Sequence, residues 1–133
     1  PGIVETAPDT WSLYASSHYG WSSNRLQRLV VRPWGFASLN ACYRGGECTT
    51  KPLALSGDTL HLNYATSAVG SIRVEVQDAG GAAIKGFALE DATPLYGDAL
   101  DAPWPTAFSS LKGQTVRLRF VLQDADLFSI RST

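Results

Sequence analysis

The sequence contains no methionine, only two cysteines and no surplus of basic side chains. Its formal net charge is -1, so it lacks the positive charge that draws nucleic acid or an anionic membrane. No apolar run approaches the roughly 20 residues of a membrane-spanning helix. These absences predict that the chain binds neither nucleic acid nor membrane, and they favour a neutral ligand or a protein partner.

The chain is short, and its charge density is low. Its 133 residues correspond to one domain, and we predict a single module over residues 1–133. Charged residues make up 17%, a fraction typical of an exported β-module. Because the chain starts at Pro1 rather than with methionine, we expect it to be excised from a larger multidomain enzyme that is secreted by a bacterium.

The hydrophobic pattern alternates with period 2, and no segment shows a convincing helical period. This alternation predicts an all-β protein, an antiparallel, jelly-roll-like β-sandwich of eight or nine short strands. The segment "QDADLFS" interrupts one alternating stretch, and we interpret it as a turn that joins two strands. Residues 108–113, "FSSLKG", predict one helical turn that Gly113 ends. Strands are expected in the segments 10–16, 25–32, 35–41, 48–55, 59–66, 70–78, 114–124 and 126–132, with a further short strand after the turn that opens "DAGGAAIKGF", residues 78–87.

A long segment without periodicity, residues 87–108, mixes acids, prolines and aromatics. Ordered loops of this length are often functional. Asp91, Asp98 and Asp101 offer hard oxygen ligands there, so a structural calcium ion is the one cofactor that the sequence leaves open. The alternative is that these carboxylates are solvated or cap turns.

Cys42 and Cys48 flank Gly45 and Gly46 in "ACYRGGECTT". If "RGGE" forms a hairpin turn, the two cysteines lie opposite each other and can form a disulfide. The alternative is two half-buried free thiols. A zinc site is not expected, because no further cysteine or histidine pair completes four ligands.

Catalytic motifs are missing. The chain has two histidines, His18 and His61, and it contains no nucleophile elbow, no metalloprotease motif and no phosphate-binding loop. We therefore predict no catalytic residues and a protein that is not itself an enzyme.

Aromatic residues in turn-like segments are the strongest functional signal. Trp34 lies between Pro33 and Gly35, a turn signature that pushes its indole outward. The alternative for Trp34 and for Trp21 is a ring that folds onto the edge of the sandwich. An exposed aromatic face stacks on the C–H face of a sugar ring, and nearby polar side chains bind its hydroxyls. The predicted carbohydrate-binding residues are Trp34 and Trp21 as platforms, Tyr19 and Trp104 as secondary walls, and Asn24 and Arg25 as polar partners.

Three stretches carry a family resemblance over about residues 10–131: "SNRLQRLVVRPWGFASLNA", "TTKPLALSGDTLHLNYATSAVGSIRVEVQDAGGAAIKGFALED" and "LKGQTVRLRFVLQDADLFSIR". They resemble the C-terminal β-sandwich module of glycoside-hydrolase-like proteins that carry a five-bladed propeller. The resemblance implies a non-catalytic module that either packs on the propeller or binds carbohydrate. Trp34, Cys42 and Cys48 depart from the pattern expected for that family, and a surface tryptophan indicates that binding has been gained.

The leading hypothesis is therefore a carbohydrate-binding module that holds a polysaccharide-degrading enzyme on its poly- or oligosaccharide. The alternative is a structural accessory module that packs against the catalytic domain of the parent chain. That alternative predicts an exposed apolar patch formed by Trp11, Tyr14 and Tyr19.

Overall fold

The computed structural model describes residues 2–106 and 108–133, which divide between Ala37 and Ser38 into two compact units. Both units are antiparallel β-structure, so the predicted all-β, sandwich-like class is confirmed. The single module predicted over residues 1–133 stays a prediction. Of the described residues, those in helical geometry form one 3-10 turn, η1 (Ser109–Leu111), at the predicted place. Gly113, with a φ of 75°, follows it.

The smaller unit is a three-stranded sheet in the order β1 (Val4–Ala7), β2 (Thr10–Ser17), β3 (Arg25–Val31). β2 and β3 form seven consecutive cross-strand pairs, from Trp11 with Val31 to Ser17 with Arg25. Because side chains alternate between faces, Leu13 and its partner Leu29 share a face with Trp11, whereas Tyr14 lies on the other face.

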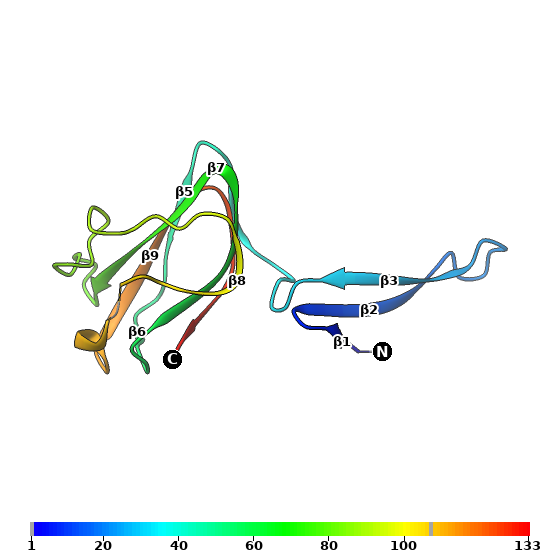
Figure 1. Cartoon of the computed structure of the whole chain (residues 1–133), viewed down its shortest axis with the longest axis horizontal. Coiled ribbons are helices and arrows are strands. Elements are labelled where there is room, and N and C mark those ends of the chain that lie inside the picture. The colour runs from blue at the N-terminus through cyan, green and yellow to red at the C-terminus, as the bar shows by residue number, and fades with distance from the viewer. Residues whose placement is uncertain (1, 107) are drawn as a thin grey trace. The chain divides into compact units, whose positions relative to one another are not determined.

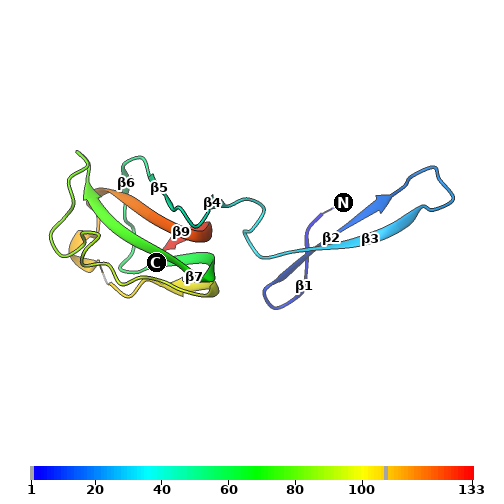
Figure 2. The same ribbon diagram turned by 90° about the horizontal axis from the view of Figure 1, so that it is seen from above.

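The larger unit is built around two long strands, β7 (Leu60–Asp78) and β9 (Thr115–Ser132), which pair along almost their whole length. β8 (Asp98–Pro103) pairs with the other edge of β7. Three short strands pair with the other edge of β9: β4 (Leu39–Ala41), β5 (Gly46–Thr49) and β6 (Leu53–Ala54). Figures 1 and 2 show the strands of this unit, and in Figure 2 β5 and β7 lie on opposite sides of β9.

Nine strands are found in the described chain, a number within the expected eight or nine, but β7 and β9 are long and each joins two of the expected segments. The expected turn at "QDADLFS" is wrong, because β9 continues through it with a bend at Asp124, whose φ is 43°. β7 bends at the same level through a bulge between Thr66 and Ser71. A Cβ on Gly70 would lie 2.3 Å from the carbonyl oxygen of Asp124, so the two backbones touch at the bend. Figure 2 shows both strands curving within this unit.

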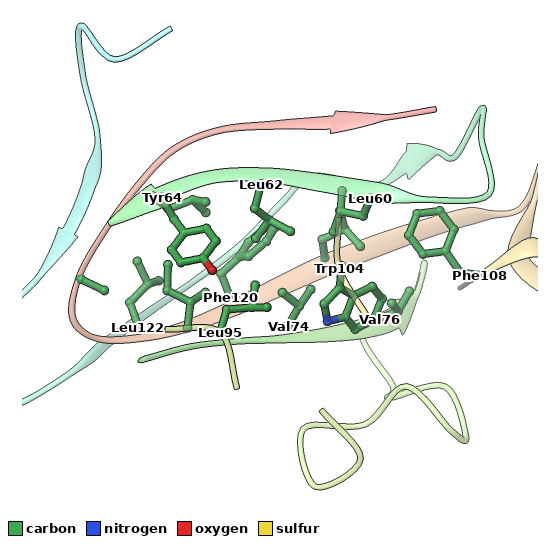
Figure 3. Close-up of a cluster of buried hydrophobic side chains, with 14 of the residues drawn as sticks. Leu60, Leu62, Tyr64, Val74, Val76, Leu95, Trp104, Phe108, Phe120 and Leu122 are labelled. Atoms are coloured by element: carbon green, nitrogen blue, oxygen red, sulfur yellow. The ribbon is translucent and has the colours of Figure 1, made fainter. Parts of the chain in front are cut away.

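The bend folds the sheet so that its two halves enclose one core. Figure 3 shows Leu60, Leu62 and Tyr64 pointing from one half of β7 toward Val74 and Val76 on the other half. Phe120 of β9 and Phe108 fill the space between the halves and are almost completely buried. Burying one large apolar side chain between the facing halves of the sheet stabilises the folded state by about 2 kcal/mol.

The predicted cysteine hairpin does not form. β4 and β5 pair with successive positions of β9 rather than with each other, so Cys48 lies opposite Phe120 whereas the carbonyl of Cys42 accepts the N–H of Asp124. Four residues of β9 span about 13 Å, beyond the roughly 7 Å Cα separation that a disulfide tolerates. In the described chain both cysteines are therefore free thiols, with Cys42 exposed and Cys48 half-buried.

Candidate functional site

Trp34 occupies a tight turn that follows β3. The N–H of Gly35 donates to the carbonyl of Arg32 at 3.0 Å, and Pro33 fixes the second position of the turn. Trp34 takes the third position with a φ of 57°, in the left-handed region. Such a conformation costs a non-glycine residue roughly 1–2 kcal/mol. The side chain of Arg32 packs against Gly35, where a Cβ would lie 2.0 Å from Cγ of Arg32.

The ring of Trp34 rests on the half-buried Trp11 of β2. The two ring centroids lie 5.1 Å apart with an interplanar angle of 63°, which is an edge-on packing geometry. Phe36 packs on the same Trp11 at 6.1 Å. Trp34 stays 70% exposed and Phe36 58% exposed, so both rings face solvent while Trp11 supports them. We call Trp11, Trp34 and Phe36 the aromatic shelf.

Sequence reasoning missed Phe36 and did not assign Trp11 to the binding site. The signal for Phe36 was present in "PWGF", because a glycine between two aromatics lets the chain turn and bring both rings to one support. For Trp11, alternation with Leu13 correctly indicated one face of a strand. That face carries no second layer of strands within the smaller unit, so Trp11 is only half-buried.

A second aromatic cluster lies in the loop between β2 and β3, which we call the hairpin tip (residues 18–25). Tyr19 is 86% exposed and Trp21 is 75% exposed. The loop is ordered by the N–H of Trp21 donating to the carbonyl of His18, and by the N–H of Asn24 donating to the carbonyl of Trp21. His18 and Gly20 have positive φ values of 56° and 82°, which reverse the chain and leave both rings outside.

Polar groups suited to sugar hydroxyls lie beside the tip aromatics. The hydroxyl of Ser16 donates to Oδ1 of Asn24 at 2.7 Å, which fixes the side-chain amide of Asn24. Arg25 begins β3 and is exposed. Nδ1 of His18 lies 2.9 Å from Oγ of Ser23, so this histidine holds the loop. The tip thus combines two exposed rings with an amide and a guanidinium.

The predicted residues do not form one site. Trp34 follows the end of β3 and the hairpin tip precedes its start, and these ends are about 20 Å apart for seven extended residues. Figures 1 and 2 show the tip at the opposite end of the three-stranded sheet from the segment after β3. Tyr19, Trp21, Asn24 and Arg25 therefore belong to one cluster and Trp34 to the other.

Trp104 is unavailable to a ligand, which corrects its assignment as a wall. It is 3% exposed and packs between Phe87 and Phe108 in the core. The non-periodic segment that carries it contains β8, whose pairing with β7 holds the preceding residues in place. The backbone N–H of Trp104 donates to the carbonyl of Leu60, and this pairing places the side chain of Trp104 in the core.

The three aspartates proposed for calcium have separate surroundings. Asp101 accepts a hydrogen bond from Arg131 at 2.6 Å and lies 3.4 Å from Nδ1 of His61. Asp98 begins the same strand, whereas Asp91 lies in a turn seven residues earlier. Within residues 2–106 and 108–133, no group of three or more His, Cys, Asp or Glu side chains is arranged to hold a metal ion.

One buried charge is structural. Glu75 accepts hydrogen bonds from Gln77, from the backbone N–H of Leu89 and from Arg119, which also pairs with Glu47. Burial raises the pKa of Glu75, but these hydrogen bonds and the Arg119 charge outweigh it, so the net pKa is lowered. The network fastens the segment around Leu89 to β7 and β9.

A shallow, open hollow lies elsewhere in the larger unit, between residues 44–47 and 121–123. It is lined by Arg44, Glu47 and Gln123 and contains none of the predicted binding residues.

No protein-family model, curated protein or solved structure matches this chain. The resemblance to the accessory module of propeller enzymes therefore stays a prediction. In the described residues, no helix is long and apolar enough to span a membrane.

Proposed function

We propose that this chain is a non-catalytic carbohydrate-binding module of a secreted polysaccharide-degrading enzyme, with the aromatic shelf as its principal platform. One observation carries the proposal. Trp34 adopts an unfavourable left-handed backbone conformation, yet its indole is 70% exposed. Trp11 fixes the orientation of that indole. Strained residues with exposed functional groups concentrate at binding sites.

The shelf suits a sugar ring because its surface is apolar, rigid and open. A ring preordered by its turn and by edge contact loses little entropy when a ligand stacks on it. The hairpin tip supplies a second platform, with hydrogen-bonding partners at Asn24 and Arg25. Few contacts form at either place, so we expect a dissociation constant between about 1 µM and 1 mM, or about −8 to −4 kcal/mol.

The test is electrophoresis of the whole chain in gels that contain a panel of polysaccharides. Trp34→Ala should lose the retardation, while its melting temperature stays close to that of the parent because an exposed side chain contributes little to stability. Tyr43→Ala is the matched control, because Tyr43 is also exposed but lies outside both aromatic clusters, and it should be retarded normally. If no polysaccharide in the panel alters the migration of the unmutated chain, the proposal is overturned.

A second candidate, a structural accessory module that packs on a catalytic domain, is favoured by the apolar side chains exposed in the smaller unit. They include Ile3, Val4, Tyr14 and Leu26. The single patch expected from Trp11, Tyr14 and Tyr19 is absent from this unit, because Tyr14 lies on the opposite face of β2 from Trp11 and Tyr19 lies at the tip. If this second candidate holds, no glycan retards the migration of the unmutated 133-residue chain.

A further inference from the structure

The outer edge of β3 is open. The sheet order is β1-β2-β3, and in the described residues no strand pairs with the side of β3 that faces away from β2. An edge strand presents a row of backbone N–H and C=O groups that can pair with another extended chain. The whole of β3, Arg25–Val31, is available in this way.

This edge has no proline, bulge or short strand to prevent pairing, whereas the opposite edge of the same sheet does. β1 has only four residues, its pairing with β2 is interrupted by a bulge between Glu5 and Ala7, and Pro8 follows it. β3 contains no proline or glycine, and its seven pairs with β2 run without a register shift. Natural proteins usually shorten, bulge or cover exposed edges to prevent unwanted pairing. An intact, straight edge is therefore a surface suited to strand addition.

The side chains of β3 are also suited to a partner strand. Leu26 is 73% exposed, and Val30 lies on the same face and is exposed as well. Leu29, on the other face, is half exposed. A strand added to the edge would place its own side chains beside these residues on both faces, and such cross-strand apolar pairs stabilise a sheet.

Charge decides which partner fits. Residues 10–37 contain no aspartate or glutamate, whereas β3 carries Arg25 and Arg28. Arg28 donates to the hydroxyls of Ser12 and Thr6. Because hydroxyl groups are neutral, these hydrogen bonds do not compensate the positive charge of Arg28. A second copy of β3 would bring only arginines to the edge, and like charges across a strand pair are destabilising. A strand that carries carboxylates is complementary.

We propose that the outer edge of β3 binds an extended segment of a partner polypeptide in which two carboxylates three residues apart, one for each face of the sheet, stand among apolar side chains, so that the segment becomes a fourth strand of the sheet. The main-chain hydrogen bonds provide the pairing. Arg25 and Arg28 select the acidic segment, one on each face of the sheet. This binding uses no residue of the aromatic shelf, and it shares only Arg25 with the hairpin tip.

The probe is a capped synthetic heptapeptide of valine with two glutamates three residues apart, Val-Glu-Val-Val-Glu-Val-Val, added to the whole isotope-labelled chain while amide hydrogen exchange is followed by NMR. In the free chain, every second amide of β3 should exchange rapidly, because it points away from β2. The acidic peptide should protect these amides, and a valine–lysine peptide of the same length is the matched control. Two opposite-charge pairs in place of two like-charge pairs predict a preference of about tenfold.

Charge reversal gives a second, independent readout. Arg25→Glu with Arg28→Glu should transfer the preference to the lysine peptide. Arg25→Glu alone should reduce the preference for the acidic peptide without disturbing the hydrogen bonds of Arg28. The proposal is overturned by equal protection from both peptides, by outward amides that are already protected in the free chain, or by protection that rises with protein concentration alone. Because the readout uses no glycan, its failure leaves the carbohydrate proposal unaffected.

Discussion

A methyl group added at Gly70 should disrupt the bend on which the larger unit depends. A Cβ at this position would lie 2.3 Å from the carbonyl oxygen of Asp124 and 2.6 Å from that of Gln123. Cβ contacts shorter than 3.0 Å are essentially never observed, so β7 and β9 must separate by several tenths of an ångström. Both obstacles are backbone atoms of a paired strand, which cannot move aside as a flexible side chain does.

The cost of Gly70→Ala follows from overpacking. Forcing extra atoms into a packed region destabilises a protein by about 1–3 kcal/mol. For a folding unit of about 100 residues, each kcal/mol lowers the melting temperature by roughly 4–8 °C. A penalty of about 2 kcal/mol therefore predicts a melting temperature lower by roughly 8–16 °C.

The matched control is Gly46→Ala. Gly46 also lies in a strand beside β9, but a Cβ there would meet only the Cβ of Ala41, at 3.4 Å, an ordinary contact. Reduced freedom of the unfolded chain then makes Gly46→Ala neutral or slightly stabilising, by up to about 1 kcal/mol. Thermal unfolding of both variants, followed by circular dichroism, measures the difference. Equal melting temperatures for Gly70→Ala and the parent chain would refute the close approach of the two strands at the bend.

Two further predictions concern the larger unit. Glu75→Gln should lower the free energy of unfolding at pH 7 by about 1–3 kcal/mol, because Glu75 is a buried charged acceptor. The pKa of Glu75 in the folded state lies below the ordinary 4.5, so its stabilisation is complete above pH 4.5 and is lost as the pH falls through the lowered pKa. In denaturant titrations, the free energies of unfolding of the variant and the unmutated chain should therefore converge in acid. A difference that stays constant with pH would contradict the network. In thiol labelling of the native chain, Cys42 should react faster than Cys48, because Cys42 is exposed. Burial raises the pKa of the Cys48 thiol, and its backbone hydrogen bond with Phe120 lowers that pKa by a smaller amount. Equal labelling rates would show that Cys48 is as accessible as Cys42.

Much of the fold was predictable because it depends on short-range patterns. Alternation of apolar and polar side chains located β2 and β3 and both halves of β7 and β9. The 3-10 turn before Gly113 follows from the same kind of local signal. The strands that were not predicted, β1 and β8, lack alternation and exist because their backbones pair with an existing edge.

The candidate site was only partly predictable, for the same reason. Gly20, Pro33 and Gly35 specify turns, so an outward position of Trp21 and Trp34 was one of two outcomes that the neighbouring residues allowed, and the structure shows both rings exposed. Trp104 has similar neighbours, Pro103 and Pro105, yet it is buried. Its position is decided by the backbone hydrogen bond to Leu60, a residue 44 positions away in the sequence.

The sequence by itself determined which residues alternate and where the chain turns, since these properties depend on side-chain period and on the backbone freedom of glycine and proline. Only the tertiary structure decided that the aromatic residues separate into two clusters at opposite ends of one sheet and that the cysteines lie apart along β9. It also decided that β3 keeps an open edge. Strand pairing joins residues that are distant in sequence through uniform backbone groups, and those groups carry no signal in the order of the side chains.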